Sequence, residues 1–183
     1  MQILYMQILA HITGPTGSGK TTIGEILQIK YPHLKIIELD NVYRQVLKKY
    51  NLEKDELNNI KKKILLELQK LTNNNIVITG NNVISSKKDF SDAIYYKINA
   101  KYKYFIHINK NKILKRRFKR HIEFISKNLD KYYNKGIKKG SLIIDFELWK
   151  KKINAPYKTK FYKNYNYKFM NNKDIIKELN TLF

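Results

Sequence analysis

A segment near the start of the chain, Gly14-Pro-Thr-Gly-Ser-Gly-Lys-Thr21, places a lysine and a threonine directly after a glycine-rich loop. It meets the phosphate-binding pattern G-x-x-x-x-G-K-[S/T] in full. Its glycines, Gly14, Gly17 and Gly19, permit the backbone angles that turn successive N–H groups toward phosphate oxygens. Lys20 supplies a charge for the β- and γ-phosphates, and Thr21 offers a hydroxyl to Mg²⁺. The other residues expected to contact the nucleotide here are Thr16, Ser18 and Thr22. The segment therefore predicts that the chain binds ATP with Mg²⁺.

A second cluster of polar residues, Glu38, Asp40, Tyr43 and Arg44, lies where the next predicted strand ends. Ligands of parallel α/β sheets bind at the carboxyl ends of the strands, so we expect Asp40 on the same edge as the phosphate loop. Asp40 is a candidate for accepting a proton from a substrate hydroxyl and for holding Mg²⁺ through water. Two structural roles stay open: an N-cap, and an ion pair with Arg44 along a helix surface.

Arginine is scarce in this chain, which uses lysine as its default basic residue. Besides Arg44, the sequence has Arg116, Arg117 and Arg120, all within five residues of one another. Guanidinium groups suit phosphates and the charge that develops during phosphoryl transfer. We therefore expect Arg116 to bind the nucleotide and Arg117 and Arg120 to act in catalysis. A solvated basic helix face is the alternative.

The elements that must position these residues follow from apolar periodicity. Strands are predicted over 8–13, 34–39, 75–79, 104–108 and 167–170. Helices are predicted over 21–30, 41–49, 53–71, 86–99, 110–129, 146–162 (as far as Pro156) and 174–182, with a lysine-rich turn region over 131–140. Strands that alternate with helices indicate a parallel sheet covered on both faces.

This alternation predicts the fold class. We expect an α/β protein with the P-loop NTPase architecture: a three-layer α/β/α sandwich around a five-stranded, mostly parallel sheet. The length of 183 residues suits one domain, 1–183, in which the region of about 110–140 resembles a lid.

Composition narrows the function classes. The chain has no cysteine, which excludes disulfides and cysteine-based metal sites, and its longest apolar stretch is too short and too polar to span a bilayer. A cytoplasmic protein that does not act at a membrane is expected. The net charge of +22 invites a nucleic-acid partner. However, the richness in Lys, Ile, Asn and Tyr is what A/T-rich codons would produce, and that explanation competes with a functional basic surface.

Four segments together resemble the uridine kinase family and its relatives, including the nicotinamide riboside kinases. They are G-P-T-G-S-G-K-T-T at 14–22, L-D-N-V-Y-R at 39–44, I-V-I-T-G at 76–80 and the strand and arginine-rich helix at 105–121. The resemblance implies that Asp40 is the general base, that Tyr43 and Arg44 contact the substrate, and that the three clustered arginines clamp phosphates. Two positions depart from the family's pattern: Thr79 replaces the usual glutamate and His121 the usual aspartate.

The function expected from these features is transfer of the γ-phosphoryl group of ATP to a hydroxyl of a small, nucleoside-like molecule. Two alternatives stay open. A nucleoside-monophosphate kinase shares the loop and an arginine-rich lid. A nucleic-acid-binding or end-processing P-loop protein would use the positive charge and the interleaved tyrosines and lysines of 157–168, on which bases can stack.

Overall fold

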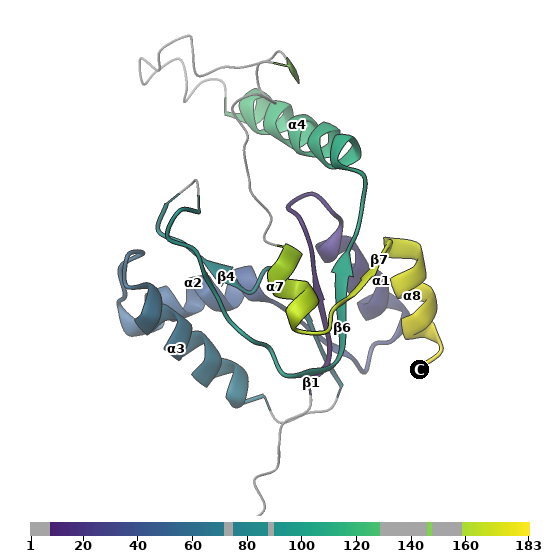
Figure 1. Ribbon diagram of the computed structural model, residues 1–183, viewed down its shortest axis with the longest axis horizontal. Coiled ribbons are helices and arrows are strands. Elements are labelled where there is room, and N and C mark those ends of the chain that lie inside the picture. Colours follow the sequence, from purple (N-terminus) through teal and green to yellow (C-terminus); the bar gives the residue numbers. More distant parts are fainter. Residues whose placement is uncertain (1–7, 72–74, 88–89, 129–145, 148–158) are drawn as a thin grey trace, which may run out of the picture. The chain divides into compact units, whose positions relative to one another are not determined.

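The computed structural model describes residues 8–71, 75–87, 90–128, 146–147 and 159–183 (Figure 1). The chain divides into two compact units. The first unit comprises Met1–His107 and Tyr157–Phe183, and the second comprises Ile108–Pro156. The expectation of one domain with a lid-like region therefore stays a prediction.

A five-stranded sheet forms the centre of the first unit. Its strands lie in the order β2 (Lys35–Glu38), β3 (Ile76–Thr79), β1 (Ile8–Thr13), β6 (Ala100–Ile106) and β7 (Lys168–Met170). Each neighbouring pair is parallel. The strand β3, which lies between β2 and β1, is buried along its whole length, as expected of a parallel sheet with both faces covered. The predicted α/β class with a parallel sheet is confirmed.

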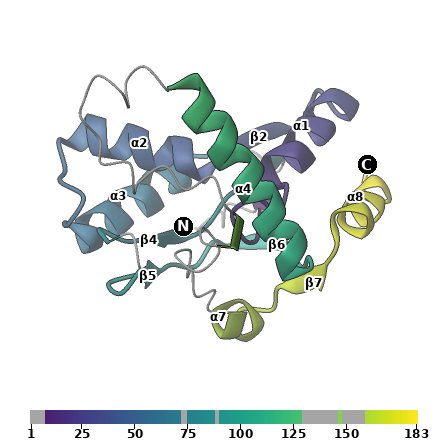
Figure 2. The same ribbon diagram turned by 90° about the horizontal axis from the view of Figure 1, so that it is seen from above.

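Helices cover both faces of this sheet, which gives three layers (Figures 1 and 2). One layer contains α1 (Lys20–Lys30) and α8 (Asn172–Asn180), which share a core cluster with Val77. The opposite layer contains α2 (Leu39–Tyr50) and α3 (Leu57–Gln69), which share a cluster with Ile76 and Ile78. Successive residues of β3 thus point to opposite faces, as a strand's period of two requires.

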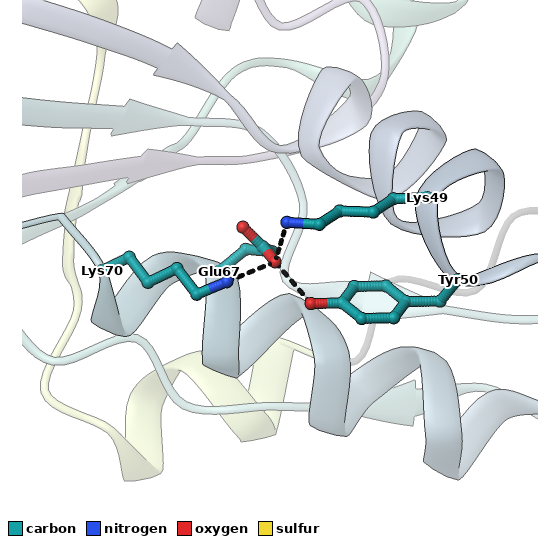
Figure 3. A network of polar contacts seen from close by, with 4 residues as sticks. All are labelled: Lys49, Tyr50, Glu67 and Lys70. Atoms are coloured by element: carbon teal, nitrogen blue, oxygen red, sulfur yellow. Dashed lines mark hydrogen bonds and ion pairs between the residues drawn. The ribbon is translucent and has the colours of Figure 1, made fainter.

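The helices α2 and α3 are joined by apolar packing and by a polar network. Ile60, Ile64 and Leu68 of α3 are buried at spacings of four residues, which places them on one face of the helix. Across the surface, one carboxylate oxygen of Glu67 accepts hydrogen bonds from Lys70 (2.8 Å), Tyr50 (2.6 Å) and Lys49 (2.9 Å) (Figure 3). These bonds lower the pKa of Glu67 to about 2.

The prediction of a helix over 86–99 is wrong. The described residues of this region instead form a short antiparallel pair, β4 (Val83–Ile84) with β5 (Ile94–Tyr95). The carboxylate of Asp92 accepts hydrogen bonds from the hydroxyls of Ser85 and Ser86, and such local bonds compete with a helix. After β5, burial alternates residue by residue from Tyr96 to Ala100, which is the period of an extended chain.

The other predicted elements that lie within the described residues agree with the structure apart from their ends. The strand predicted over 104–108 is β6, which begins earlier, at Ala100. The helix predicted over 110–129 is α4 (Lys110–Lys127), in the second unit. The helix predicted over 146–162, as far as Pro156, lies mostly outside the described residues, and α7 (Thr159–Asn164) begins after Pro156. The turn region over 131–140 lies outside the described residues. None of the helices described has the length and apolar character needed to cross a bilayer.

Candidate functional site

The phosphate loop joins the end of β1 to the start of α1, as its sequence predicts. Gly14, Gly17 and Gly19 all have positive φ angles, of 151°, 86° and 97°. A Cβ atom on Gly14 would lie 2.9 Å from the Cβ atom of Ile106 in β6, so this position of the loop also requires a residue without a side chain. Gly19 is the N-cap residue of α1 and has no side chain with which to cap it. The first N–H groups of the helix therefore face the loop, which suits an anion.

Polar atoms converge inside this loop. The ammonium group of Lys20 donates to the carbonyl oxygens of Gly14 (2.9 Å) and Pro15 (3.0 Å), so it lies over the loop. Ser18 is completely buried, and its Oγ atom has no hydrogen-bond partner within the described residues. Leaving a buried hydroxyl unpaired costs about 1–3 kcal/mol. A phosphate oxygen would satisfy this hydroxyl, and the residues present therefore fit the triphosphate of ATP. Thr16, inside the loop, and Thr22, in the first turn of α1, are exposed.

The strand register brings the ends of β2, β3 and β1 to one level. Glu38 pairs with Thr79, and Thr79 pairs with Ile12, so the second polar cluster begins beside the phosphate loop. Glu38 and Thr21 line the same surface groove, whose volume is about 450 Å³. Thr79, which stands where a carboxylate is common, is buried, and its methyl group lies next to Gly24 of α1. The groove thus contains a carboxylate that the end of β3 lacks.

Asp40 lies in the first turn of α2 and is exposed. The N-cap residue of this helix is Glu38, which makes no side-chain cap bond, so the N-cap alternative for Asp40 is wrong. Within the described part of the chain, no ion pair joins Asp40 to Arg44, whose side chain is exposed. Tyr43 of α2 is half-buried against the core cluster that α2 and α3 share with β3, and burial raises its pKa. Asp40 therefore presents its carboxylate to solvent at the edge that carries the phosphate loop.

The clustered arginines belong to α4 in the second unit. Arg116 and Arg120 are exposed, Arg117 is half-buried, and the spacing of four places Arg116 and Arg120 on one face. The helix begins after Asn109, whose side-chain oxygen accepts from the N–H of Asn111 at 2.8 Å. The structure thus confirms the helix that carries these arginines. Their action on a phosphate held in the first unit stays a prediction.

Sequence reasoning missed two residues that support the site. His11 is buried in β1 and bonds to the carbonyl oxygen of Gly80, the residue that follows β3. Asn172, the first residue of α8, donates from Nδ2 to the carbonyl oxygen of Ser18 at 3.0 Å. A histidine inside an otherwise apolar strand was a visible signal for the first. The second had none, since 154 positions separate Asn172 from the loop.

In the described part of the chain, no group of three or more His, Cys, Asp or Glu residues is placed to hold a metal ion. A site for Mg²⁺ here would therefore depend on Thr21, one or two carboxylates, water and the substrate's phosphates. That is the usual way in which proteins bind this ion.

Comparisons with known proteins do not place the chain in a family. No family model and no curated protein matches it. The chain is similar to the solved structure of a shikimate kinase from Bacteroides thetaiotaomicron, with 17% identity and a TM-score of 0.38. That match covers 60% of this chain and 62%, less than two thirds, of the shikimate kinase chain. The chain is also similar to a structure described as APE1195, with 16% identity and a TM-score of 0.43, over 98% of this chain and 96% of that one. The P-loop α/β fold is assigned from the strand order and loop geometry above.

Proposed function

We propose that the protein is an ATP-dependent kinase that phosphorylates a hydroxyl group of a small, nucleoside-like molecule. The observation that carries this proposal is the juxtaposition of two groups on one edge of the sheet. The phosphate loop, with Lys20 and the buried Ser18 hydroxyl, stands at the end of β1. Asp40 stands two strands away, after β2, with an exposed carboxylate. An anion site beside a proton acceptor is what transfer of a phosphoryl group to a hydroxyl requires.

The loop holds the donor. Its N–H groups and the start of α1 bind phosphate oxygens, and the Ser18 hydroxyl donates to one of them. The ammonium group of Lys20 exchanges the carbonyl oxygens of Gly14 and Pro15 for the β- and γ-phosphates. These interactions orient the γ-phosphorus and compensate the charge that its oxygens develop. We propose that Arg117 and Arg120 of the second unit also compensate this developing charge, and that Arg116 binds the nucleotide.

Asp40 acts on the acceptor. Its carboxylate accepts the proton of the acceptor's hydroxyl as that oxygen forms a bond to the γ-phosphorus. The bond from the γ-phosphorus to the oxygen that bridges it to the β-phosphate breaks, and the electron pair leaves with ADP. Asp40 is exposed in the first unit, so the hydroxyl of an acceptor can approach its side chain from solvent.

The metal ion that accompanies ATP would be held by Thr21 and the nearby carboxylates. Bound Mg²⁺ neutralises charge on the phosphates during transfer. Thr21 and Glu38 line one groove, and Asp40 follows Glu38 by two residues. We propose that Glu38 and Asp40, acting through water, replace the carboxylate that is absent at Thr79.

The acceptor class rests on the sequence resemblance to the uridine kinase family in segment 39–44. Asp40, Tyr43 and Arg44 occupy the first turns of α2, so their side chains start from one short stretch of helix. In this proposal Tyr43 and Arg44 contact the acceptor beside the base, and the half-buried ring of Tyr43 supplies an apolar surface for it.

The proposal is tested by measuring ADP production from ATP and Mg²⁺ in the presence of nucleosides, nucleoside monophosphates, small metabolic alcohols and oligonucleotide ends. We expect ADP to form in stoichiometric amounts with a phosphorylated nucleoside-like product, identified by mass spectrometry. The matched control is Lys20→Ala, which should lose this activity. ADP production that depends on oligonucleotide ends and not on small molecules would refute the proposed acceptor class.

A further inference from the structure

His11 occupies an unusual position for a polar residue. It lies in β1, a central strand of the sheet, and it is completely buried. Both of its ring nitrogens have partners far away in the sequence. Nδ1 lies 2.6 Å from the hydroxyl oxygen of Tyr167, and Nε2 lies 3.1 Å from the carbonyl oxygen of Gly80. His11 thus connects the segment before β7 to the residue after β3.

The partners determine which nitrogen bears the proton. A carbonyl oxygen can only accept, so Nε2 carries the hydrogen and donates it to Gly80. Nδ1 then accepts from the hydroxyl group of Tyr167. Burial, with a smaller effect from Lys103 and Lys20, lowers the pKa of His11 to about 3. The ring is therefore neutral at physiological pH, and each nitrogen has one defined partner.

Both backbone polar groups of Gly80 are hydrogen-bonded to residues of β1. Its N–H donates to the carbonyl oxygen of Ile12 at 3.1 Å, and its carbonyl oxygen accepts from His11. Gly80 also contacts the start of α2. A Cβ atom added to it would lie 2.9 Å from the Cβ atom of Leu39 and 3.2 Å from the Leu39 backbone nitrogen. Leu39 is the first residue of α2 and immediately precedes Asp40. A chain of direct contacts therefore runs from His11 through Gly80 to the helical turn that carries the proposed base.

We propose that His11 is a positioning residue for Asp40, acting through its hydrogen bond to the carbonyl oxygen of Gly80. The inference rests on the proposed function, because it takes Asp40 as the base. The hydrogen bond fixes the end of β3, against which the first turn of α2 packs. An apolar residue at position 11 would fill the core, but it would leave the buried carbonyl oxygen of Gly80 without this donor. A displacement of about 1 Å at a reacting group can lower a rate about 100-fold.

Three substitutions separate positioning from simple core packing. His11→Gln keeps a donor near the place of Nε2 and loses the acceptor for Tyr167. His11→Asn keeps an acceptor near the place of Nδ1, and its amide is too short to reach Gly80. Tyr167→Phe leaves the bond to Gly80 intact and removes only the hydroxyl group. All three disturb the buried network and should lower the melting temperature.

The value of kcat should separate the variants that keep the hydrogen bond to Gly80 from the variant that loses it. We expect His11→Asn to lower kcat at least tenfold with the KM for ATP unchanged within about twofold, as expected of a change confined to the transition state. His11→Gln and Tyr167→Phe should retain kcat within about threefold. In the Asp40→Asn background, His11→Asn should lower kcat no further, because the base that it positions is already absent. A wild-type kcat in His11→Asn would overturn the proposal. So would a double variant whose fold-loss of kcat equals the product of the losses in His11→Asn and Asp40→Asn.

A readout without turnover keeps this inference separate from the proposed function. Amide hydrogen exchange, measured by NMR on the whole chain, should be faster in His11→Asn than in the wild type at Tyr43 and Arg44, whose N–H groups close the first turn of α2 on the carbonyl oxygens of Leu39 and Asp40, and unchanged there in His11→Gln. If the wild type phosphorylates no acceptor, the kinase proposal fails, while the exchange rates still show whether His11 orders the start of α2. Equal exchange at these two amides in His11→Asn and the wild type would refute the positioning role. So would a tenfold loss of kcat in His11→Gln with its amide protection preserved.

Discussion

At the scale of single residues, Lys20 is the side chain on which nucleotide binding should depend most. It is the basic residue of the phosphate loop, and its ammonium group already lies over the loop carbonyls. Lys20→Ala removes this charge and leaves the packing of α1 intact, so the affinity for ATP should fall at least tenfold, or about 1.4 kcal/mol. Isothermal titration with a non-hydrolysable ATP analogue and Mg²⁺ measures this. Lys30→Ala, at the exposed far end of α1, is the matched control, and equal affinities for the two variants would refute the assignment of the loop.

Asp40 should matter for turnover and hardly at all for stability. Asp40→Asn keeps the shape of the side chain and loses its basicity, and general base catalysis contributes about 10²–10⁴ in rate. Because Asp40 is exposed and is not the N-cap of α2, the melting temperature should hardly change. Steady-state kinetics and a thermal melt test the two halves of this expectation. Asp55→Asn, an exposed aspartate in the turn before α3, controls for the change of charge. Near-normal turnover in Asp40→Asn would remove Asp40 from the mechanism.

His11 makes stability depend on pH. Its pKa is about 3 in the folded chain and 6.5 when unperturbed, so between these values the unfolded chain binds the additional proton. The stability that the neutral ring contributes is complete above pH 6.5 and is lost as the pH falls toward 3. From pH 7.5 to pH 5 this loss amounts to about 2 kcal/mol.

Urea denaturation of the wild type and of His11→Gln at both pH values isolates this effect, because other titrating groups are common to both proteins. The free energy of unfolding of the wild type should fall by about 2 kcal/mol more than that of His11→Gln. An equal fall in the two proteins would show that the ring does not stay neutral in the fold.

At the scale of elements, α8 supports the phosphate loop from outside it. Asn172 donates to the carbonyl oxygen of Ser18, and its Nδ2 atom fills the space beside Gly19, where a Cβ atom would lie at 2.6 Å. Asn172→Ala should lower the affinity for ATP severalfold, by about 1 kcal/mol, because the loop loses one hydrogen bond that orders it. Titration calorimetry measures the effect. Lys177→Ala, exposed in the last turn of the same helix, should bind ATP as the wild type does. If both variants bind as the wild type does, α8 has no part in ordering the loop.

The elements that sequence predicted well are those whose signal is local. The phosphate loop needs glycines at fixed positions, and the amphipathic α3 needs only its own periodicity. The prediction for 86–99 was wrong because the structure of this region depends on contacts with other residues. Asp92 bonds to Ser85 and Ser86, and Tyr96 and Ile98 are buried against the rest of the core. Such tertiary burial overrides a weak helical pattern.

The candidate site also combines residues with a local sequence signal and residues whose role depends on the completed fold. The residue types of Lys20, Thr21 and Asp40 suggested their chemistry, and the strand order then placed them on one edge. The supporting contacts of His11 and Asn172 were not predictable, since each joins segments that are brought together only by the completed sheet.

At the scale of the whole molecule, the net charge of +22 has a testable meaning. If the lysines are compositional, their attraction for oligonucleotides is spread over the surface and is strongly screened at about 0.15 M salt, where the Debye length is about 8 Å. We expect no oligonucleotide binding tighter than about micromolar under these conditions. We also expect substitution of Arg116, Arg117 or Arg120 to lower kinase turnover more than oligonucleotide affinity. Fluorescence anisotropy over a salt series measures binding. Tight binding that survives at this salt and depends on the arginines would favour a nucleic-acid end-processing function.

The contact between Asn172 and Ser18 also has a consequence for how the protein is made. The strand β1 pairs with β6, β6 pairs with β7, and α8 follows directly, so the support of the phosphate loop comes from residues translated more than 150 positions after it. Contacts of such long sequence separation form late, because the loop between them must first be closed. A nascent chain on the ribosome therefore carries its complete phosphate-binding motif long before it can hold that motif in shape. Capture of nucleotide should therefore become possible only after α8 has been translated, and ATP, which would bind the ordered loop, would then stabilise the folded state.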